Sequence, residues 1–309
     1  MTGRPDPILD PDHLALRSAE RDGRSGLAGQ SATRTDLDDT EDEARDVLLI
    51  HGQPGSSLIW TRVLPLLRSR GLRVLAVDRP GYGHTGGPAL DQFANAAAIA
   101  QVLDERQSSP AVIVGHSLGA GIALALAANA PHHVRALVLI APAAGPSAIT
   151  VTDHLLAAPL IGPALTWSGF RAAGLALHIP PLRQRILTDR IGLSPTEGKE
   201  VVHRITHGQV WRSFTVEQRH LVTDAHRLQE RFCEIHCPVV IVAGTRDRIA
   251  RPRLVATLAR QLPESTITKT DTGHLIPIDD PETVVKAVLR ALQWDCRNPL
   301  GSPGAAKAT

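Results

Sequence analysis

The chain has 309 residues, of which 43% are apolar, and its 33 Lys and Arg residues nearly balance its 31 Asp and Glu residues. At about 150 residues per domain this length suggests two domains, and the apolar fraction suffices for a sizeable core. The net charge of +2 argues against a general nucleic-acid or anionic-membrane binder, because such a protein needs a concentrated basic surface. We therefore expect no nucleic-acid partner.

The cellular setting is inferred from cysteines and apolar runs. Cys233, Cys237 and Cys296 are too few for a disulfide framework, which favours a reducing compartment. The first 30 residues carry Arg, Asp and Pro but no apolar h-region, so we expect no signal peptide. The sequence contains no uninterrupted run of about 18 apolar residues, so we expect no integral membrane segment. A cytoplasmic protein is expected, and its oligomeric state stays open, a homodimer included.

The two ends of the chain differ from the rest. Seven acids and one arginine lie between Asp36 and Asp46, and such a stretch has little to bury. Residues 1–45 are therefore expected to form a poorly ordered leader, with a short strand near residues 13–17 as the alternative. Residues 297–309 are expected to be a flexible tail.

From Val47 onward, short apolar runs alternate with helical segments. Most runs are continuous rather than alternating, as in strands buried on both faces of a parallel sheet. Strands separated by helices indicate an open α/β sheet with right-handed crossovers. The predicted strands are 47–50, 72–77, 111–114, 136–140, 239–243 and 265–270. The predicted helices are 57–69, 91–106, 118–129, 252–262 and 281–293.

The alternation stops between residues 143 and 237. This stretch has helical spacing and holds five of the nine aromatic residues, although it is under a third of the chain. We interpret it as a helical insertion, so that residues 46–142 and 238–296 form the core of the fold.

The strongest chemical signal is Gly115-His116-Ser117-Leu118-Gly119, which lies between a predicted strand and a predicted helix. A serine at such a tight turn needs small neighbours, and the turn raises its Oγ atom above the sheet. The N–H of Leu118 would then lie at a helix N-terminus, where it can stabilise an oxyanion.

A serine nucleophile needs a base, and the base needs an orienting carboxylate. Asp247 follows the strand 239–243, and His274 follows the next strand. Asp153 and Asp224, both in the insertion, are rival carboxylates. The group Cys233, His236 and Cys237 lacks the second ligand cluster that a zinc site requires, so we expect no metal.

Five landmarks in order make residues 47–293 resemble an α/β-hydrolase of the capped, epoxide-hydrolase-like group. They are His51-Gly-Gln-Pro-Gly55, Asp78-Arg-Pro-Gly-Tyr-Gly-His-Thr85, the Ser117 motif, the Asp247 turn and the Gly273-His274 turn. The resemblance implies a mostly parallel, doubly wound sheet with residues 143–237 as a helical cap. It also implies that Gln53 supplies a second oxyanion N–H, and that His51 shapes the loop.

Two departures from that group narrow the chemistry. Its epoxide hydrolases and haloalkane dehalogenases use an aspartate nucleophile where this chain has Ser117, and its epoxide hydrolases use cap tyrosines, whereas the one tyrosine here is Tyr82, outside the cap. Both activities are disfavoured. We expect a cofactor-free serine hydrolase that cleaves a small-molecule carboxylic ester with Ser117, His274 and Asp247.

Other readings of the same three residues stay open. They are a lactonase, a C–C bond hydrolase, an acyltransferase, a perhydrolase, or a ligand-binding receptor with slow turnover. Because caps of this family lie over the nucleophile, we expect at least one of four insertion aromatics to face the substrate pocket. These are Trp167, Phe170, Trp211 and Phe214.

Overall fold

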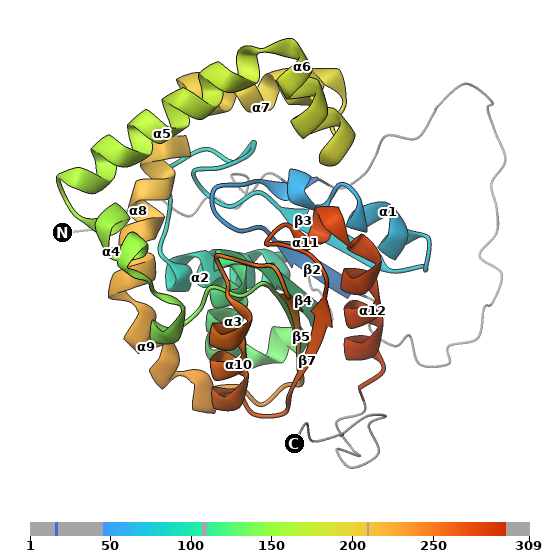
Figure 1. Cartoon of the computed structure of the whole chain (residues 1–309). Helices are drawn as coiled ribbons and strands as arrows, with labels where there is room; N and C mark the ends of the chain where they lie inside the picture. Colours follow the sequence, from blue (N-terminus) through green and yellow to red (C-terminus); the bar gives the residue numbers. More distant parts are fainter. Residues whose placement is uncertain (1–15, 18–45, 107–109, 209, 295–309) are drawn as a thin grey trace, which may run out of the picture.

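The computed structural model describes residues 16–17, 46–106, 110–208 and 210–294 (Figure 1). Its sheet has seven strands in the order β1-β3-β2-β4-β5-β6-β7. All neighbouring pairs are parallel except β1, which runs antiparallel to β3 at one edge. This confirms the predicted fold class, because parallel neighbours joined through helices make a doubly wound α/β sheet.

The strands lie where continuous apolar runs predict them. They are β2 (Asp46–Ile50), β3 (Arg73–Val77), β4 (Ala111–His116), β5 (Val134–Ile140), β6 (Val239–Gly244) and β7 (Ser265–Thr270). The central strands β4 and β6 are buried along their whole length, whereas β7 is half-exposed at the second edge.

The expected leader lies mostly outside the described residues. Its described part is β1 (Leu16–Arg17), which adds two residues to the sheet edge beside β3, as the alternative of a short strand near residues 13–17 predicted. The expected tail, residues 297–309, also lies outside the described residues.

Helices cover both faces of the sheet (Figure 1). α1 (Val63–Arg68) and α12 (Pro281–Leu292) lie on one face, and α2 (Gln92–Glu105), α3 (Leu118–Asn129) and α10 (Pro252–Gln261) lie on the other. The short α11 (Ile276–Asp279) leads into α12, whose N-cap Asp280 accepts a hydrogen bond from the Thr283 N–H at 3.1 Å. An aspartate cap before Pro281 is the start signal that the sequence shows.

Between β5 and β6 the chain leaves the sheet and forms consecutive helices. These are α4 (Val151–Ala157), α5 (Ile161–His178), α6 (Pro180–Arg183), a π-helical turn (Gln184–Arg190), α7 (Pro195–His207), α8 (Val210–Thr223) and α9 (Ala225–Glu230). Figure 1 shows α4 to α8 over the carboxyl ends of the strands. Helix α5 runs along the outer side of this group of helices.

The main core is built from the sheet and its covering helices, and a smaller apolar cluster packs within the insertion around Leu177, Leu187 and Val202. Within the described ranges, none of the helices combines the length and apolar character needed to cross a bilayer. The loops at the carboxyl ends of β2, β4, β6 and β7 meet beneath the insertion, which is where ligands bind in open α/β sheets.

Candidate active site

Ser117 occupies the sharp turn between β4 and α3, where its backbone has a φ of 54°. Residues with a Cβ atom avoid this left-handed region, so neighbouring groups must hold the turn. The Ser117 N–H donates to the Ile140 carbonyl at 2.9 Å, and the Ser117 carbonyl accepts from the N–H groups of Ala120 and Ala143 at 3.0 and 3.1 Å. These bonds fix the residue whose Oγ atom points above the sheet.

Glycines around this turn are required by space. A Cβ atom on Gly119 would lie 2.5 Å from the carbonyl oxygen of Ile50, and one on Gly52 would lie 2.8 Å from the Cβ atom of Ser117. Real Cβ atoms do not approach other atoms so closely. The loop after β2 can therefore lie against the serine turn because glycine stands at both positions.

His274 and Asp247 reach Ser117 from the loops after β7 and β6. The His274 Nε2 atom lies 3.1 Å from Ser117 Oγ, and the Nδ1 atom lies 2.9 Å from Asp247 Oδ2. Asp247 Oδ1 accepts from the N–H groups of Ile249 and Ala250 at 2.8 and 3.0 Å. Burial alone would raise the pKa of Asp247, but the His274 contact and these N–H groups hold that pKa below its ordinary value. A charged Asp247 accepts a hydrogen bond from the Nδ1–H group of His274, which leaves Nε2 unprotonated and able to accept a proton.

His116 contacts the site, and the sequence did not reveal this role. The serine motif requires Gly115, Ser117 and Gly119 but allows any residue at position 116. Its buried ring donates from Nε2 to the backbone carbonyl of His274 at 3.0 Å, and Trp60 packs edge-on against it. Burial and the neighbouring His274 lower the pKa of His116 to about 3. A neutral His116 thus supports the loop that carries His274 without placing a positive charge beside it.

Gln53 and Leu118 line the same cavity as Ser117 and His274. Leu118 is the first residue of α3, and Gln53 lies in the loop after β2. No hydrogen bond within the described part of the chain uses the backbone N–H of either residue. Both N–H groups are therefore free to bind a ligand atom, which is the property expected of oxyanion donors.

The cavity above Ser117 has a volume of about 560 Å³ and takes its walls from the core and from the insertion. Leu254 and Leu258 of α10 lie on the core side, and Leu156 of α4 and Leu221 of α8 lie on the insertion side. Apolar walls with a few convergent polar groups are typical of a small-molecule site.

The structure brings one of the four predicted pocket aromatics to this cavity. Phe214 lines it, whereas Trp167, Phe170 and Trp211 line a separate cleft of about 250 Å³ between α5, α7 and α8. Phe214 shares one face of α8 with Gln218, which also lines the cavity, and Trp211 lies one turn nearer the start of the helix. Spacing alone could not show which turn of α8 stands over the serine.

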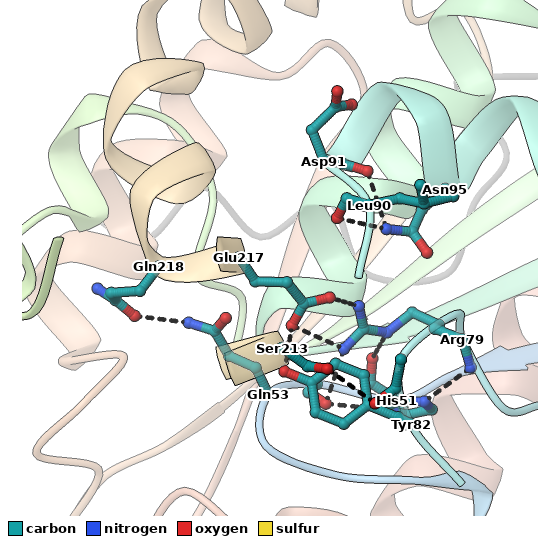
Figure 2. Close-up of polar contacts among 12 residues, drawn as sticks. His51, Gln53, Arg79, Tyr82, Leu90, Asp91, Asn95, Ser213, Glu217 and Gln218 are labelled. Carbon is teal, nitrogen blue, oxygen red and sulfur yellow. Dashed lines mark hydrogen bonds and ion pairs between the residues drawn. The ribbon is translucent and has the colours of Figure 1, made fainter. Parts of the chain in front are cut away.

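A buried ion pair between Arg79 and Glu217 of α8 lies beside the loop after β2 (Figure 2). The Arg79 guanidinium also donates to the carbonyls of His51 and Gly52, both at 3.1 Å. The Tyr82 hydroxyl donates to Glu217 Oε2 at 2.8 Å. One guanidinium therefore joins the insertion to the two residues that precede Gln53.

His51 is held by the same arrangement. Its Nε2 atom accepts a hydrogen bond from the backbone N–H of Arg79 at 3.0 Å, and its Nδ1 atom donates to the backbone carbonyl of Gly52 at 2.8 Å. Burial and the Arg79 charge lower the pKa of His51 to about 3. Burial also raises the pKa of Glu217, against the opposing effect of Arg79. These contacts fit the expectation that His51 shapes the loop.

A second connection between the insertion and the loop runs through amide side chains. The Gln53 Nε2 atom donates to Gln218 Oε1 at 2.7 Å (Figure 2), and the Gln218 Nε2 atom donates to Asp153 Oδ1 at 2.8 Å. Asp153 also closes a capping box with Thr150 at the start of α4. Asp153, a rival carboxylate in the sequence, is thus bonded within the insertion and not to His274.

Among the residues that the structure describes, two clusters of side chains could bind a metal ion, and neither contains Ser117, His274 or Asp247. Asp224, the other rival carboxylate, belongs to one of them and lies 3.3 Å from His220. The clusters are Asp104 with His132 and His133, and Asp91 with His220 and Asp224. Carboxylates of both clusters already have partners: Asp104 Oδ1 lies 2.8 Å from His133 Nε2, and Asp91 Oδ1 accepts from the Ala94 N–H at 2.7 Å.

The chain matches a known protein family and resembles several known proteins. The family model described as "alpha/beta hydrolase fold" matches residues 47–281. The lipase LipV of Mycobacterium tuberculosis is 39% identical to this chain over 119 residues. The match covers 37% of this chain and 44% of LipV, which is less than half of that protein. A pimeloyl-[acyl-carrier protein] methyl ester esterase of Neisseria meningitidis is 32% identical over 235 residues, 73% of this chain and 84% of the relative. The crystal structure of Cfl2 from Burkholderia cenocepacia shares the fold, with a TM-score of 0.66 at 20% identity over 81% of this chain and 88% of that one.

We predict that the free energy of unfolding rises with pH between about 3 and 6.5. His51 and His116 have pKa values of about 3 in the folded protein, against 6.5 ordinarily, so the unfolded chain binds more protons throughout this range. Each histidine contributes about 1.4 kcal/mol per pH unit. Urea unfolding of the His116→Asn variant should show a shallower slope, and the exposed His132→Asn control should keep it. Equal slopes for both variants would contradict this reading.

Glu217→Gln should destabilise the protein by about 3–5 kcal/mol, because it leaves the Arg79 charge buried without a partner. Exchanging both residues, Arg79→Met with Glu217→Met, should cost less than the sum of the two single changes. The control is Glu282→Gln, which breaks an exposed pair with Arg70 and should change stability by less than about 1 kcal/mol. A double variant whose loss of stability equals the sum of the two single losses would show that Arg79 and Glu217 are not coupled.

Proposed function

The chain belongs to the α/β-hydrolase fold family and is a hydrolase, and we propose that it cleaves carboxylic esters through an acyl-enzyme formed on Ser117. The observation that carries this proposal is one line of contacts on the cavity wall. Ser117 Oγ lies 3.1 Å from His274 Nε2, and His274 Nδ1 lies 2.9 Å from Asp247.

In the first half of the proposed reaction, His274 Nε2 accepts the proton of Ser117 as Oγ attacks the ester carbonyl carbon. The carbonyl oxygen becomes an oxyanion, and the N–H groups of Gln53 and Leu118 stabilise it. The intermediate collapses to the acyl-enzyme, and His274 returns the proton to the departing alcohol. Asp247 holds the imidazole in the tautomer that this step needs.

In the second half, water replaces the alcohol. His274 accepts a proton from the water as its oxygen attacks the acyl carbon, and the second oxyanion forms between the same two N–H groups. Cleavage of the Ser117 ester bond, with the proton passing from His274 to Oγ, releases the carboxylic acid. The lowered pKa of Asp247 supports this role, since the carboxylate stays charged while the imidazolium forms.

An ester is favoured over an epoxide or a haloalkane because the nucleophile is a serine. The one tyrosine, Tyr82, is buried and donates to Glu217, and it does not line the cavity with Ser117. The names of two relatives, a lipase and a methyl ester esterase, support the same reaction class for this chain.

Residues 143–237 act, in this proposal, as a cap that selects the acyl or alcohol group, over a core formed by residues 46–142 and 238–296. The support is the share of the cavity wall that α4 and α8 supply, through Leu156, Phe214 and Leu221. An apolar wall of this kind suits a hydrophobic acyl chain.

Ser117→Ala and His274→Ala should each lower kcat for an activated ester by about 10⁴–10⁶-fold, because triad residues act as a unit. Asp247→Asn should be nearly as damaging, whereas the matched control Asp224→Asn should keep most of the activity. Circular dichroism and melting confirm that each variant is folded. Full ester turnover in folded Ser117→Ala protein would rule out the proposed nucleophile.

Phe214→Ala should change the ratio of kcat/KM between a short and a bulky acyl ester, by up to about 1–3 kcal/mol of differential binding. Trp167→Ala, which removes a ring from the separate cleft, is the matched control and should leave the ratio unchanged. If both variants keep the wild-type ratio, the aliphatic wall and not Phe214 sets the choice of ester.

A further inference from the structure

The segment from the start of α4 to the end of α5 exposes many large apolar side chains. Ten large apolar side chains are exposed among the described residues, and eight of them lie between Val151 and Ile179. Two of these, Val151 and Leu160, are 86% and 88% exposed. A contiguous exposed apolar patch marks an interaction surface. We call this set the outer apolar face: Val151, Leu155, Leu160, Ile161, Leu165, Trp167, Leu175 and Ile179.

Helix α5 has apolar groups on both sides. Ile161, Leu165 and Leu175, with Ile179 at the C-cap, recur at helical spacing and are exposed, and the opposite side of the helix is buried around Leu177. A helix that is apolar all round is usually buried, yet α5 runs along the outer side of the insertion (Figure 1). Its exposed side therefore lacks the contact that its composition favours.

The charged residues on α5 and just after it are basic, and the acidic residues Asp153 and Asp189 lie at the two ends of this segment. Between Asp153 and Asp189 the chain has no acidic residue, and it carries Arg171, Arg183 and Arg185. No salt bridge joins these three arginines to any residue that the structure describes. The whole-chain charge of +2 gives no sign of this region, because acids elsewhere in the sequence balance it.

Beside the outer apolar face lies the cleft of about 250 Å³ between α5, α7 and α8. Two tryptophans and two arginines line it, and the guanidinium of Arg212 stacks over the ring of Trp211, 5.1 Å from the ring centroid. Tryptophan prefers the boundary between lipid tails and headgroups, and arginine binds phosphate through paired N–H groups. The cleft therefore combines the side chains that suit an anionic headgroup.

The outer apolar face continues to the mouth of the catalytic cavity. Val151 is exposed and also lines that cavity, as does Ile249, which is 61% exposed. Arg248 and Arg251 are exposed at the same mouth. A surface that covers α4 would thus lie against the opening through which a substrate enters.

We propose that the outer apolar face docks on an anionic lipid bilayer, with the mouth of the cavity turned toward the membrane surface. A second copy of the chain suits this face less well, because a two-fold interface would bring the arginines of both copies together and their like charges would repel. Apolar and aromatic side chains flanked by arginines are the features of helices that lie in the membrane interface. This inference stands apart from the proposed ester hydrolysis, since it concerns binding alone.

The test is sedimentation of the full chain with vesicles of phosphatidylcholine, with and without about 30% phosphatidylglycerol. We expect binding to the anionic vesicles at least tenfold tighter than to the neutral ones, and weaker binding at high salt because the charges are exposed. Ser117→Ala protein should bind equally well, which separates this result from the fate of the catalytic proposal.

Two pairs of variants test the surface itself. Leu160→Glu with Leu175→Glu should lower vesicle binding at least tenfold, whereas Ile267→Glu, which places one glutamate on the half-exposed edge strand β7, should not. Arg171→Gln with Arg185→Gln should weaken binding to anionic vesicles by about fivefold for each arginine. The control for charge is Lys286→Gln, an exposed cation of α12.

Absence of wild-type binding to anionic vesicles would overturn the proposal, as would equal binding by the Leu160→Glu, Leu175→Glu protein. Size-exclusion chromatography supplies the remaining outcome. A wild-type dimer that those two changes split into monomers, without vesicle binding, would assign the face to a second copy and reject the membrane.

Discussion

Ser117 has a backbone conformation that a residue with a side chain adopts at a cost of about 1–3 kcal/mol, and much of the site can be understood as what holds it there. Hydrogen bonds from and to β5 and the following loop fix its N–H and carbonyl. Gly119 and Gly52 leave the space that the turn and the adjacent loop need. The same conformation places Oγ within reach of His274, so the strain and the proposed chemistry have one origin.

The loop after β2 depends on a second constraint, the buried charge of Arg79. A guanidinium without water needs acceptors, and here they are the carbonyls of His51 and Gly52 together with the carboxylate of Glu217. An apolar contact of equal volume could stabilise the fold as well. The ion pair adds directionality: it ties α8 of the insertion to the residues just before Gln53, whose side chain α8 also holds through Gln218. The wall of the cavity and its N–H donors are thereby positioned together.

The sequence predicts the fold well because its strands are buried on both faces. Continuous apolar runs such as Val239–Ala243 need no partner to be recognised, and the observed β6 ends one residue later, at Gly244. The three residues proposed for catalysis are also visible in the sequence, since each lies within four residues of the predicted end of a strand. The structure brings them within hydrogen-bonding distance of one another.

Other features depend on contacts between distant segments and leave no local pattern. Glu217 lies 138 residues from Arg79, and a glutamate on a helix is usually solvated, so nothing marks it as buried. The four insertion aromatics look alike in sequence, and only the placement of α8 over the sheet separates Phe214 from Trp211. Net charge is an average over the chain, and it therefore gives no sign of the segment 154–188, which has no acidic residue.

Mass spectrometry of the protein after reaction with a fluorophosphonate tests the central claim most directly. The account predicts one covalent adduct, on the peptide that contains Ser117, formed rapidly in the wild-type protein and at least about a thousandfold more slowly in His274→Ala, because the serine is a weak nucleophile without its base. An adduct on another residue, or equal labelling rates in the two proteins, would contradict it.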